Sequence, residues 1–491
     1  MPKGRVCNSL QPIVDRITSC WYDPTIYHTN ATEKAREEMT VAPSISELDV
    51  RALWHPLTQH KPLADTPPTL IVRGEGCYLE DDQGRRYLDA MAGLWCVNIG
   101  YGRSELAETA AAQMTELPYL APTMTHAPGA QLADKILDLL GWPGRVYFSS
   151  SGSEANEVAF KVARQYHMQS GKPGGETRYK IISRHRAYHG NTLGAMSATG
   201  QAERKIGYGP MAPGFIHVPP PYTYRAHPKL TPAEHGIACA QAIEETIIYE
   251  GPETVAAVLM EPIISGGGVL VPPDEYLPRV REICDEYGVL LIFDEVVSGY
   301  GRTGKMFGHD HWDVKPDIIT MAKGLSSGYM PLAATAVQEY IFDVFMGEAG
   351  DLTHFRHINT FGGHPVSTAV GLHNLQIVEE EGLVEKARSM GDYALGQLQN
   401  LASHPWVGEA RGRGLLMGVE LVADKGTKQP LDDAEVLAIL GRCKQAGVIL
   451  GRNGNTVPGL GNILIMAPPL VATESEIDLL IEALVYALGE K

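Results

Sequence analysis

The stretch VLLIFDEVVSGYGRTGK, residues 289–305, opens with five apolar residues and continues into two acids, Asp294 and Glu295. A short run that is apolar at every position is typical of a strand buried on both faces of a sheet. On either side of it, helix-length amphipathic segments separate further runs of this kind. These runs are RVYF (145–148), YKII (179–182), VAAVLM (255–260), DIITMA (317–322) and LAATAV (332–337). The alternation predicts an α/β fold with a mostly parallel sheet.

The glycines of the opening stretch have the spacing of two kinds of nucleotide-binding loop. Gly299-x-Gly301-x-x-Gly304 matches a dinucleotide loop, and Gly299-x-x-x-x-Gly304-Lys305 nearly matches a phosphate loop. A phosphate loop needs Ser or Thr after its lysine, whereas Met306 stands there. A dinucleotide loop turns directly from strand into helix, whereas further residues intervene here. We therefore interpret the glycines as a backbone path around a site, and the acid at the strand end as the chemically important group.

Size, charge and cysteine usage exclude several classes of protein. With 491 residues, the chain is expected to form roughly two to three domains, or one large domain with a smaller one attached. A formal net charge of −17 argues against a nucleic-acid partner, which needs clustered Lys and Arg. The seven cysteines are scattered without a C-x-x-C pair, which favours reduced thiols and a cytoplasmic location. No run of about 18 apolar residues occurs and the N-terminus lacks a secretory signal, so we expect no membrane partner.

Two further patterns lie outside the predicted sheet. Residues 77–100 alternate like a hairpin around Asp82-Gln83-Gly84. Residues 366–402 have the pattern of one long helical stretch, and the segments after it indicate a separate, smaller α+β unit.

Three ionisable residues each follow one of the apolar runs. Glu261 follows VAAVLM, Asp294 follows VLLIF, and Lys323 follows DIITMA. Ligands of α/β proteins bind beyond the carboxyl ends of the strands. A single charged residue there fits a structural ion pair equally well, because buried charges need partners. Three charged residues at the ends of three successive strands favour one shared site.

Residues after two other strands add to this picture. Gly152 and Ser153 open a helix after RVYF, where free amide groups form a cradle for a phosphate; the alternative is an ordinary helix cap. Tyr188 follows a strand and can stack on a planar ligand. His185 and His189 lack the remaining ligands of a zinc site, so we interpret them as structural and expect no metal.

A lysine held with acids and a phosphate cradle fits one chemistry well. The lysine amine bonds to an aldehyde cofactor. A carboxylate beside a pyridine nitrogen keeps that nitrogen protonated, so that the ring accepts electrons. The helix N-terminus holds the cofactor phosphate.

The motifs that carry these residues resemble a known family in the same order. They are SSSGSEANEVAFKVAR, HRAYHGNTLGAMSATG, LLIFDEVVSGYGRTGKMF, KPDIITMAKGLSSGYMPLAAT, NTFGGHPVSTAVGL and APPL. Together they resemble the class III aminotransferases, which depend on pyridoxal 5'-phosphate, over roughly residues 50–490. The resemblance implies fold type I, in which a large parallel-sheet domain and a small domain from both chain ends build an active site shared across a homodimer.

The resemblance also implies a role for each matching position. Lys323 is similar to the family's catalytic lysine, which bonds the cofactor and moves the proton, and Asp294 is similar to the partner of the pyridine nitrogen. The other implied cofactor contacts are Gly152 and Ser153 at the phosphate, the stacking Tyr188, Glu261 of the EP motif, Val296 behind the ring, and Thr360, which reaches the phosphate from the partner subunit.

From the resemblance, and from the point where apolar runs begin to alternate with amphipathic segments, we expect the chain to have four parts. They are an N-terminal arm (1–50), the N-terminal part of the small domain (51–100), the large cofactor-binding domain (101–375) and the C-terminal small domain (376–491).

Substrate-binding positions follow from a narrower resemblance. AGLWCVNIGYGR resembles the omega-amino acid and amine:pyruvate transaminases, in which the tryptophan, here Trp95, lines the pocket. Arg452 falls where that subgroup has a mobile arginine that clamps a carboxylate; the alternative is a solvated surface arginine. Leu57 stands where an aromatic residue is expected. EPIISGGGVLVPPDEY and GRNGNTVPGLGN look more like taurine:pyruvate aminotransferases.

We thus expect amino transfer from an omega-amino acid, taurine-like or simple amine donor to pyruvate, giving an aldehyde or ketone and alanine by a ping-pong cycle. The alternatives are an aminomutase or decarboxylating transaminase, a nucleotide-binding protein that uses the glycines of 299–305, and a non-catalytic scaffold. The sequence leaves four questions open. They are the natural donor, the choice between pyruvate and another 2-oxo acid as acceptor, the role of residues 1–50, and whether the protein is a dimer or a tetramer.

Overall fold

The structure is a computed structural model that describes residues 43–172, 174–454 and 461–489. The chain divides into two compact units, with the division between Leu70 and Ile71. In the first unit, Ser44 caps helix α2 (Ile45–Ala52) by accepting a hydrogen bond from the Glu47 amide, and a short 3-10 helix follows at η3 (Lys61–Ala64). Most of the predicted arm, residues 1–42, lies outside the described residues.

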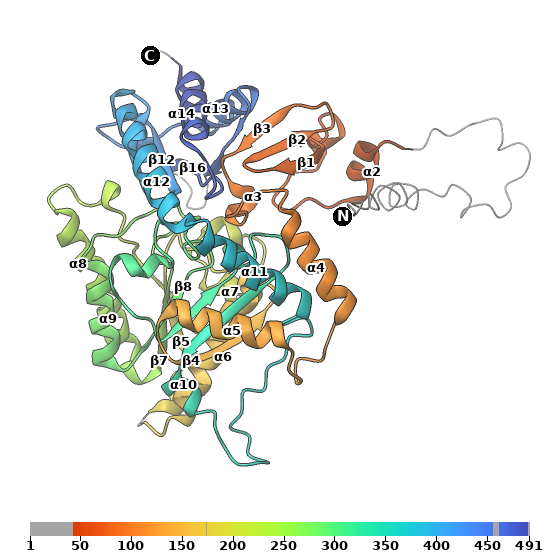
Figure 1. Ribbon diagram of the computed structural model, residues 1–491. Helices are drawn as coiled ribbons and strands as arrows, with labels where there is room; N and C mark the ends of the chain where they lie inside the picture. Colours follow the sequence, from red (N-terminus) through yellow and green to blue (C-terminus); the bar gives the residue numbers. More distant parts are fainter. Residues whose placement is uncertain (1–42, 173, 455–460, 490–491) are drawn as a thin grey trace, which may run out of the picture. The chain divides into compact units, whose positions relative to one another are not determined.

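A seven-stranded sheet forms the centre of the second unit (Figure 1). Its strand order is β4-β10-β9-β8-β7-β5-β6, and β10 runs opposite to the other six strands. The strands are β4 (Gly144–Ser149), β5 (Lys180–Arg184), β6 (Phe215–Val218), β7 (Val255–Met260), β8 (Leu290–Asp294), β9 (Ile318–Met321) and β10 (Ala333–Gln338). The predicted mostly parallel sheet is confirmed, and each apolar run coincides with a strand.

Helices cover both faces of this sheet (Figure 1). Helices α8 (Pro232–Glu250) and α9 (Tyr276–Tyr287) lie on one face, and α6 (Gly152–Gln169) lies on the other. Along β8, Leu291 and Phe293 pack with residues of α8 and α9, while Leu290 and Ile292 pack with residues of α6. Because side chains alternate along a strand, an unbroken apolar run fills both interfaces.

Two smaller sheets lie beyond one end of the large sheet (Figure 1). The first consists of β1 (Ile71–Glu75), β2 (Tyr78–Asp81), β3 (Arg86–Asp89) and β14 (Val448–Ile449); the second consists of β11 (Val407–Arg413), β12 (Leu416–Asp424), β13 (Gln429–Pro430), β15 (Gly451–Asn453) and β16 (Asn462–Met466). The antiparallel pair β2–β3 confirms the predicted hairpin. Val448 pairs in parallel with Leu88, so segments from both ends of the unit share one sheet.

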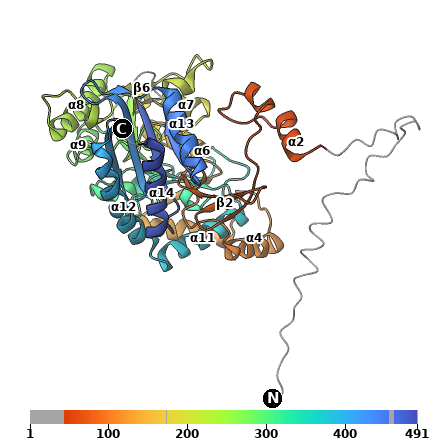
Figure 2. The same cartoon turned by 90° about the horizontal axis from the view of Figure 1, so that it is seen from above.

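The prediction of one long helix over 366–402 is wrong. The segment forms α11 (Pro365–Glu380) and α12 (Leu383–Asn400), separated by two residues. Gly382 has a φ of +62°, the left-handed conformation that ends a helix and that glycine adopts without steric cost. Helix α12 lies beside α14 (Glu474–Leu488), which also contacts α13 (Asp433–Gln445) (Figure 2).

The remaining helical elements connect these layers. They are α3 (Ala92–Trp95), α4 (Ser104–Glu116), α5 (Ala127–Leu140), η4 (Gly175–Thr177), α7 (Leu193–Ala198), η5 (Ala202–Lys205), η6 (Thr223–Arg225), η7 (Pro252–Thr254), η8 (Gly308–His311), η9 (Lys323–Leu325), α10 (Glu339–Asp343) and η10 (Leu401–Ser403). Within the described ranges, no helix combines the length and the apolar character needed to cross a membrane. The predicted boundaries at residues 50, 100 and 375 stay predictions.

Candidate active site

The carboxyl ends of three neighbouring strands carry Glu261, Asp294 and Lys323. Met260 pairs with Phe293 across β7 and β8, so the residues that follow, Glu261 and Asp294, stand side by side in the register. Lys323 begins η9, just beyond the end of β9. The structure thus places an amine and two carboxylates at one edge of the sheet.

Asp294 is buried and held by three groups. Its Oδ2 accepts a hydrogen bond of 2.9 Å from Nδ2 of Asn156 and lies 2.8 Å from Nδ1 of His189. Its Oδ1 accepts a hydrogen bond from the Val296 amide at 3.1 Å. Asn156 is oriented in turn by the Thr320 hydroxyl, which donates to its Oδ1 at 3.0 Å. A buried carboxylate with this many partners has a fixed direction.

Glu261 joins two loops beside this carboxylate. Its Oε1 accepts a hydrogen bond from the Tyr188 amide at 3.1 Å, and its Oε2 accepts one from the Ser265 amide at 2.9 Å. Burial raises the pKa of Glu261, and the nearby Asp294 raises it further, while His189 and the two amides oppose the rise. The loop after β5, which contains Tyr188, is therefore tied to the loop after β7.

Lys323 has a strained backbone and a perturbed amine. Its φ is +47°, in the left-handed region that residues with a side chain rarely adopt. Burial lowers the pKa of Lys323, and the nearby Asp294 and Glu261 offset part of the change. A lowered pKa increases the fraction of neutral amine, which is the nucleophilic form. The Nζ atom lies 5.6 Å from the centre of the Trp95 ring, so Trp95 borders the same site.

The N-terminus of α6 faces the segment that follows β8. A Cβ added to Gly152 would lie 3.0 Å from both methyl groups of Val296, so a larger residue would close this space. The Ser151 hydroxyl accepts a hydrogen bond from the Glu154 amide, whereas in the part of the chain that the structure describes no partner contacts the amides of Gly152 and Ser153. These two amides are available to an anion.

Ser153 also fixes the loop that carries Tyr188. Its hydroxyl donates to Oδ1 of Asn191 at 3.0 Å and accepts a hydrogen bond from the Asn191 amide at 3.1 Å. A Cβ on Gly190 would lie 2.5 Å from Oγ of Ser153, so only glycine permits this approach.

Glu295, the second acid of the opening stretch, has a different role. It is fully buried and accepts hydrogen bonds of 2.8 Å from the amides of both Gly308 and His309. The side chains of Ser298 and His309 contact it as well. This carboxylate therefore fixes the chain around the glycine segment.

The glycine segment itself packs against the C-terminal part of the unit. A Cβ on Gly304 would lie 2.9 Å from backbone and side chain of Arg388. Arg302 is fully buried and donates to the Leu415 carbonyl at 3.0 Å and to Oδ1 of Asn98 at 2.8 Å. These contacts make the segment part of the packed interior, as expected for a backbone path around the site.

Arg452 and its neighbour point to opposite faces of β15. Nε of Arg452 donates to Oδ1 of Asn462 at 2.9 Å, and its guanidinium pairs with Asp433 at the start of α13. Nδ2 of Asn453 instead donates to the carbonyl of Gly266, in the loop after β7. Within the described residues, no contact joins Arg452 to Lys323.

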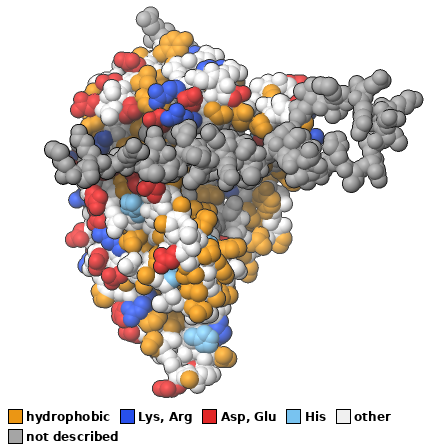
Figure 3. Space-filling view, turned by 45° about the vertical axis from the view of Figure 1, so that its right-hand side comes forward, with side chains coloured by type: hydrophobic (Ala, Val, Ile, Leu, Met, Phe, Trp, Pro, Cys, Tyr) orange, Lys and Arg blue, Asp and Glu red, His pale blue; other side chains and the backbone are white. Residues whose placement is uncertain are grey.

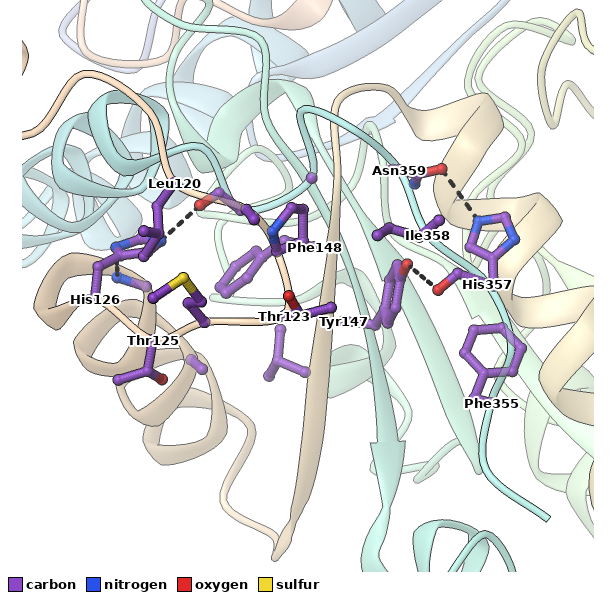
Figure 4. Close-up of a pocket in the computed structure, with 18 of the residues that line it drawn as sticks. Leu120, Thr123, Thr125, His126, Tyr147, Phe148, Phe355, His357, Ile358 and Asn359 are labelled. Atoms are coloured by element: carbon purple, nitrogen blue, oxygen red, sulfur yellow. Dashed lines mark hydrogen bonds between the residues drawn. The ribbon is translucent and has the colours of Figure 1, made fainter. Parts of the chain in front are cut away.

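Thr360 follows Asn359, which lines a cavity of about 570 Å³ (Figure 4). It is exposed, and its carbonyl accepts a hydrogen bond of 3.1 Å from the Tyr119 hydroxyl. The adjacent Asn359 donates to Oγ of Ser149, at the end of β4. Leu57 belongs to the first unit, where 83% of it is exposed.

Sequence reasoning missed the two side chains that hold Asp294. His189 follows Tyr188 directly and was interpreted only as a structural histidine, yet it contacts the site carboxylate. Asn156 lies one helical turn beyond Gly152, on the same face of α6, and this spacing is a signal that could have identified it. In the described residues, no group of three or more His, Cys, Asp or Glu is arranged to hold a metal.

Known proteins resemble this chain over most of its length. "Uncharacterized aminotransferase YhxA" of Bacillus subtilis is 51% identical over 89% of this chain and 95% of its own. Taurine–pyruvate aminotransferase of Bilophila wadsworthia is 45% identical over 88% and 94%, and putrescine–pyruvate aminotransferase of Pseudomonas aeruginosa is 40% identical over 87% and 91%.

Solved structures agree in fold. A Bacillus anthracis aminotransferase is 47% identical with a TM-score of 0.87, covering 94% of this chain and 99% of that one. An omega transaminase from Pseudomonas jessenii, solved in complex with PMP, is 37% identical with a TM-score of 0.86, covering 91% and 98%. These enzymes share the fold type I architecture. Residues 60–488 match the family model "Aminotransferase class-III". The chain therefore belongs to the class III aminotransferases, enzymes that use pyridoxal 5'-phosphate to transfer an amino group.

Proposed function

We propose that this enzyme is an amine:pyruvate aminotransferase. In this proposal Lys323 carries the proton of the donor's amine-bearing carbon, and Asp294 stabilises the protonated nitrogen of the cofactor ring. The observation that carries the proposal is the placement of Lys323 and Asp294 at neighbouring strand ends. The amine has a lowered pKa, and the carboxylate is fixed by Asn156 and His189. A proton carrier and an anchored anion are the two groups that this reaction requires of the protein.

The residues present fit the cofactor. The amides of Gly152 and Ser153, unbonded among the described residues, suit a phosphate, and the buried Asp294 carboxylate suits a protonated ring nitrogen. Tyr188 offers an aromatic face and Val296 an aliphatic one. When bound there, pyridoxal phosphate supplies an aldehyde that bonds to amines and a ring that accepts an electron pair.

Each side chain of the site has its own role in amino transfer. Asp294, held in one direction, stabilises positive charge on the ring nitrogen. Lys323 would hold the cofactor through Nζ; as a free, neutral amine it would accept the proton of the donor's amine-bearing carbon at Nζ and later deliver a proton. Glu261 positions the loop of Tyr188 through its backbone amide. Trp95 borders the space next to Nζ.

The relatives support the choice of substrates. Enzymes named for taurine and pyruvate and for putrescine and pyruvate align over most of this chain. We propose an omega-amino acid or taurine-like donor and pyruvate as the acceptor, with an aldehyde and alanine as products. Arg452 stays our prediction for the acceptor carboxylate, a role for which it must leave Asp433.

A donor panel tests this function. We expect alanine to form from pyruvate with taurine and β-alanine as the best donors, putrescine and 4-aminobutyrate as intermediate ones, and 1-phenylethylamine as the poorest. Alanine and carbon dioxide are measured in parallel, with 2-oxoglutarate as the competing acceptor. Turnover only with 2-oxoglutarate, release of carbon dioxide, or migration of the amine within one molecule would contradict the proposal.

We further propose a homodimer with shared active sites. Hydrophobic side chains gather in the lower half of one face of the molecule (Figure 3). Exposed apolar residues near Thr360 include Tyr119, Ile358 and Phe361, and the adjoining cavity offers room for a partner segment. Thr360 would then contact the phosphate bound by the partner.

Light scattering tests this assembly. We expect a mass of twice the 53.4 kDa chain, or four times if dimers pair. Thr360→Ala is expected to weaken cofactor affinity without altering that mass, because its exposed side chain supports no fold contact in the described residues. A fully active monomer would contradict the proposal.

A further inference from the structure

The proposed donors carry a negative charge at the end opposite the amine. Among the described residues discussed so far, the site has no unpaired cation to bind that charge. The charged side chains beside Lys323, Asp294 and Glu261, are both acids and offer no positive charge to a sulfonate or carboxylate. Arg452 is paired with Asp433 on the other face of β15. A cation elsewhere at the rim of the site is needed.

Arg204 has the position for this task. It lies in η5, and its guanidinium carbon stands 5.7 Å from the centre of the Tyr188 ring. The Tyr188 amide is bonded to Glu261, so this ring belongs to the candidate site. A guanidinium over an aromatic face is attracted to it and held in orientation.

The charge of Arg204 has no counter-ion in the described part of the chain. Its Nε donates to the neutral Oε1 of Gln201 at a long 3.4 Å, and among described residues no carboxylate lies within 4.0 Å of the guanidinium. Gln201 is itself buried and donates to the Arg186 carbonyl at 3.0 Å, so it fixes the base of the Arg204 side chain.

Arg411, which donates to the Gly268 carbonyl in the loop after β7, is already engaged by acids. Arg411 pairs with Glu409 and Glu420, at 2.6 Å and 2.8 Å. Arg204 is only partly buried, and a guanidinium has five N–H donors, so most of its donors can serve a ligand.

We propose that Arg204 is the specificity residue that binds the sulfonate or carboxylate at the far end of the amine donor. The planar fork of the guanidinium matches two oxygens of either anion. The inference rests on the proposed function and extends it, because it assigns the donor class to a named side chain. Uncharged amines would not use this contact.

Paired donors test the inference. For Arg204→Gln we expect kcat/KM for taurine and β-alanine to fall by about 10- to 100-fold, mainly through KM, while kcat/KM for propylamine changes by less than about threefold. Arg204→Lys should recover part of the loss, since it keeps the charge and lacks the fork. Equal losses for charged and uncharged donors, or no loss for either, would overturn the inference.

Lys205→Gln is the matched control. It removes one positive charge from the same 3-10 turn, but its Nζ contacts the Ser197 carbonyl and His217 rather than Tyr188. We expect it to leave the preference for charged donors unchanged. Melting temperature and the absorbance of the bound cofactor confirm that each variant is folded and loaded.

A binding measurement separates this inference from the proposed function. Ethanesulfonate has the anion and lacks the amine, so calorimetry with the holoenzyme reports the contact without turnover. We expect it to bind wild type and Lys205→Gln alike, and about 10-fold or more weaker to Arg204→Gln. Equal binding to all three proteins would overturn the role of Arg204. Absence of alanine formation with every donor would instead refute the proposed function.

Discussion

Replacing Lys323 with alanine is expected to abolish amino transfer, lowering kcat by at least about a thousandfold. The substitution removes the amine that lies beside Asp294 and Glu261 and that burial shifts toward its neutral form. The measurements are the rate at which alanine forms from pyruvate and the visible absorbance of the bound cofactor in the absence of substrate. Full turnover with an unchanged spectrum would refute the role of this lysine.

Lys305→Ala is the matched control for this experiment. Lys305 is exposed at the end of the glycine segment, where it imitates the lysine of a phosphate loop. We expect its removal to leave transfer intact. Loss of activity in Lys305→Ala with activity retained in Lys323→Ala would favour the nucleotide-binding alternative.

Asp294→Asn should cause the second-largest loss, about a hundredfold or more in the half-reaction with the donor. The amide has nearly the same shape and keeps a carbonyl oxygen for Asn156 and His189, but it has no charge to hold a proton on the ring nitrogen. Single-turnover kinetics measure the loss. A pH titration of the cofactor absorbance should show that protonation of the ring has shifted to lower pH.

The neighbouring acid provides the control for Asp294. Glu295→Gln should lower the free energy of unfolding by about 1–3 kcal/mol, because a buried carboxylate that accepts from Gly308 and His309 is replaced by a group with an unmatched N–H₂. Chemical denaturation measures this change. Transfer per folded molecule should remain close to wild type. Loss of transfer in Glu295→Gln alone would show that the two acids are assigned the wrong way round.

The sequence was informative where a local pattern decides the structure. An unbroken apolar run such as residues 289–293 is typical of a strand with both faces covered, and parallel strands bring their carboxyl ends to one edge. Glu261, Asp294 and Lys323 could therefore be grouped before any coordinates were known. The break at Gly382 was missed because the apolar period continues across it and only the backbone conformation reveals the turn.

The sequence was uninformative where a contact depends on register or on distant segments. Arg452 and Asn453 are adjacent, and a strand directs them to opposite faces, so a shift of one residue decides which reaches the loop after β7. His189 and Asn156 meet Asp294 only because β5, α6 and β8 converge. The spacing of apolar residues along one sequence does not predict this contact between three separate elements.

We predict that the cofactor forms a covalent bond to Nζ of Lys323. Borohydride reduction of the holoenzyme, followed by peptide mass spectrometry, tests it most directly because reduction makes the bond between amine and cofactor permanent. We predict that the added mass lies on the peptide containing Lys323 and nowhere else, and that Lys323→Ala lacks it. Labelling of a different lysine, or no labelling of a holoenzyme that is active, would contradict the claim.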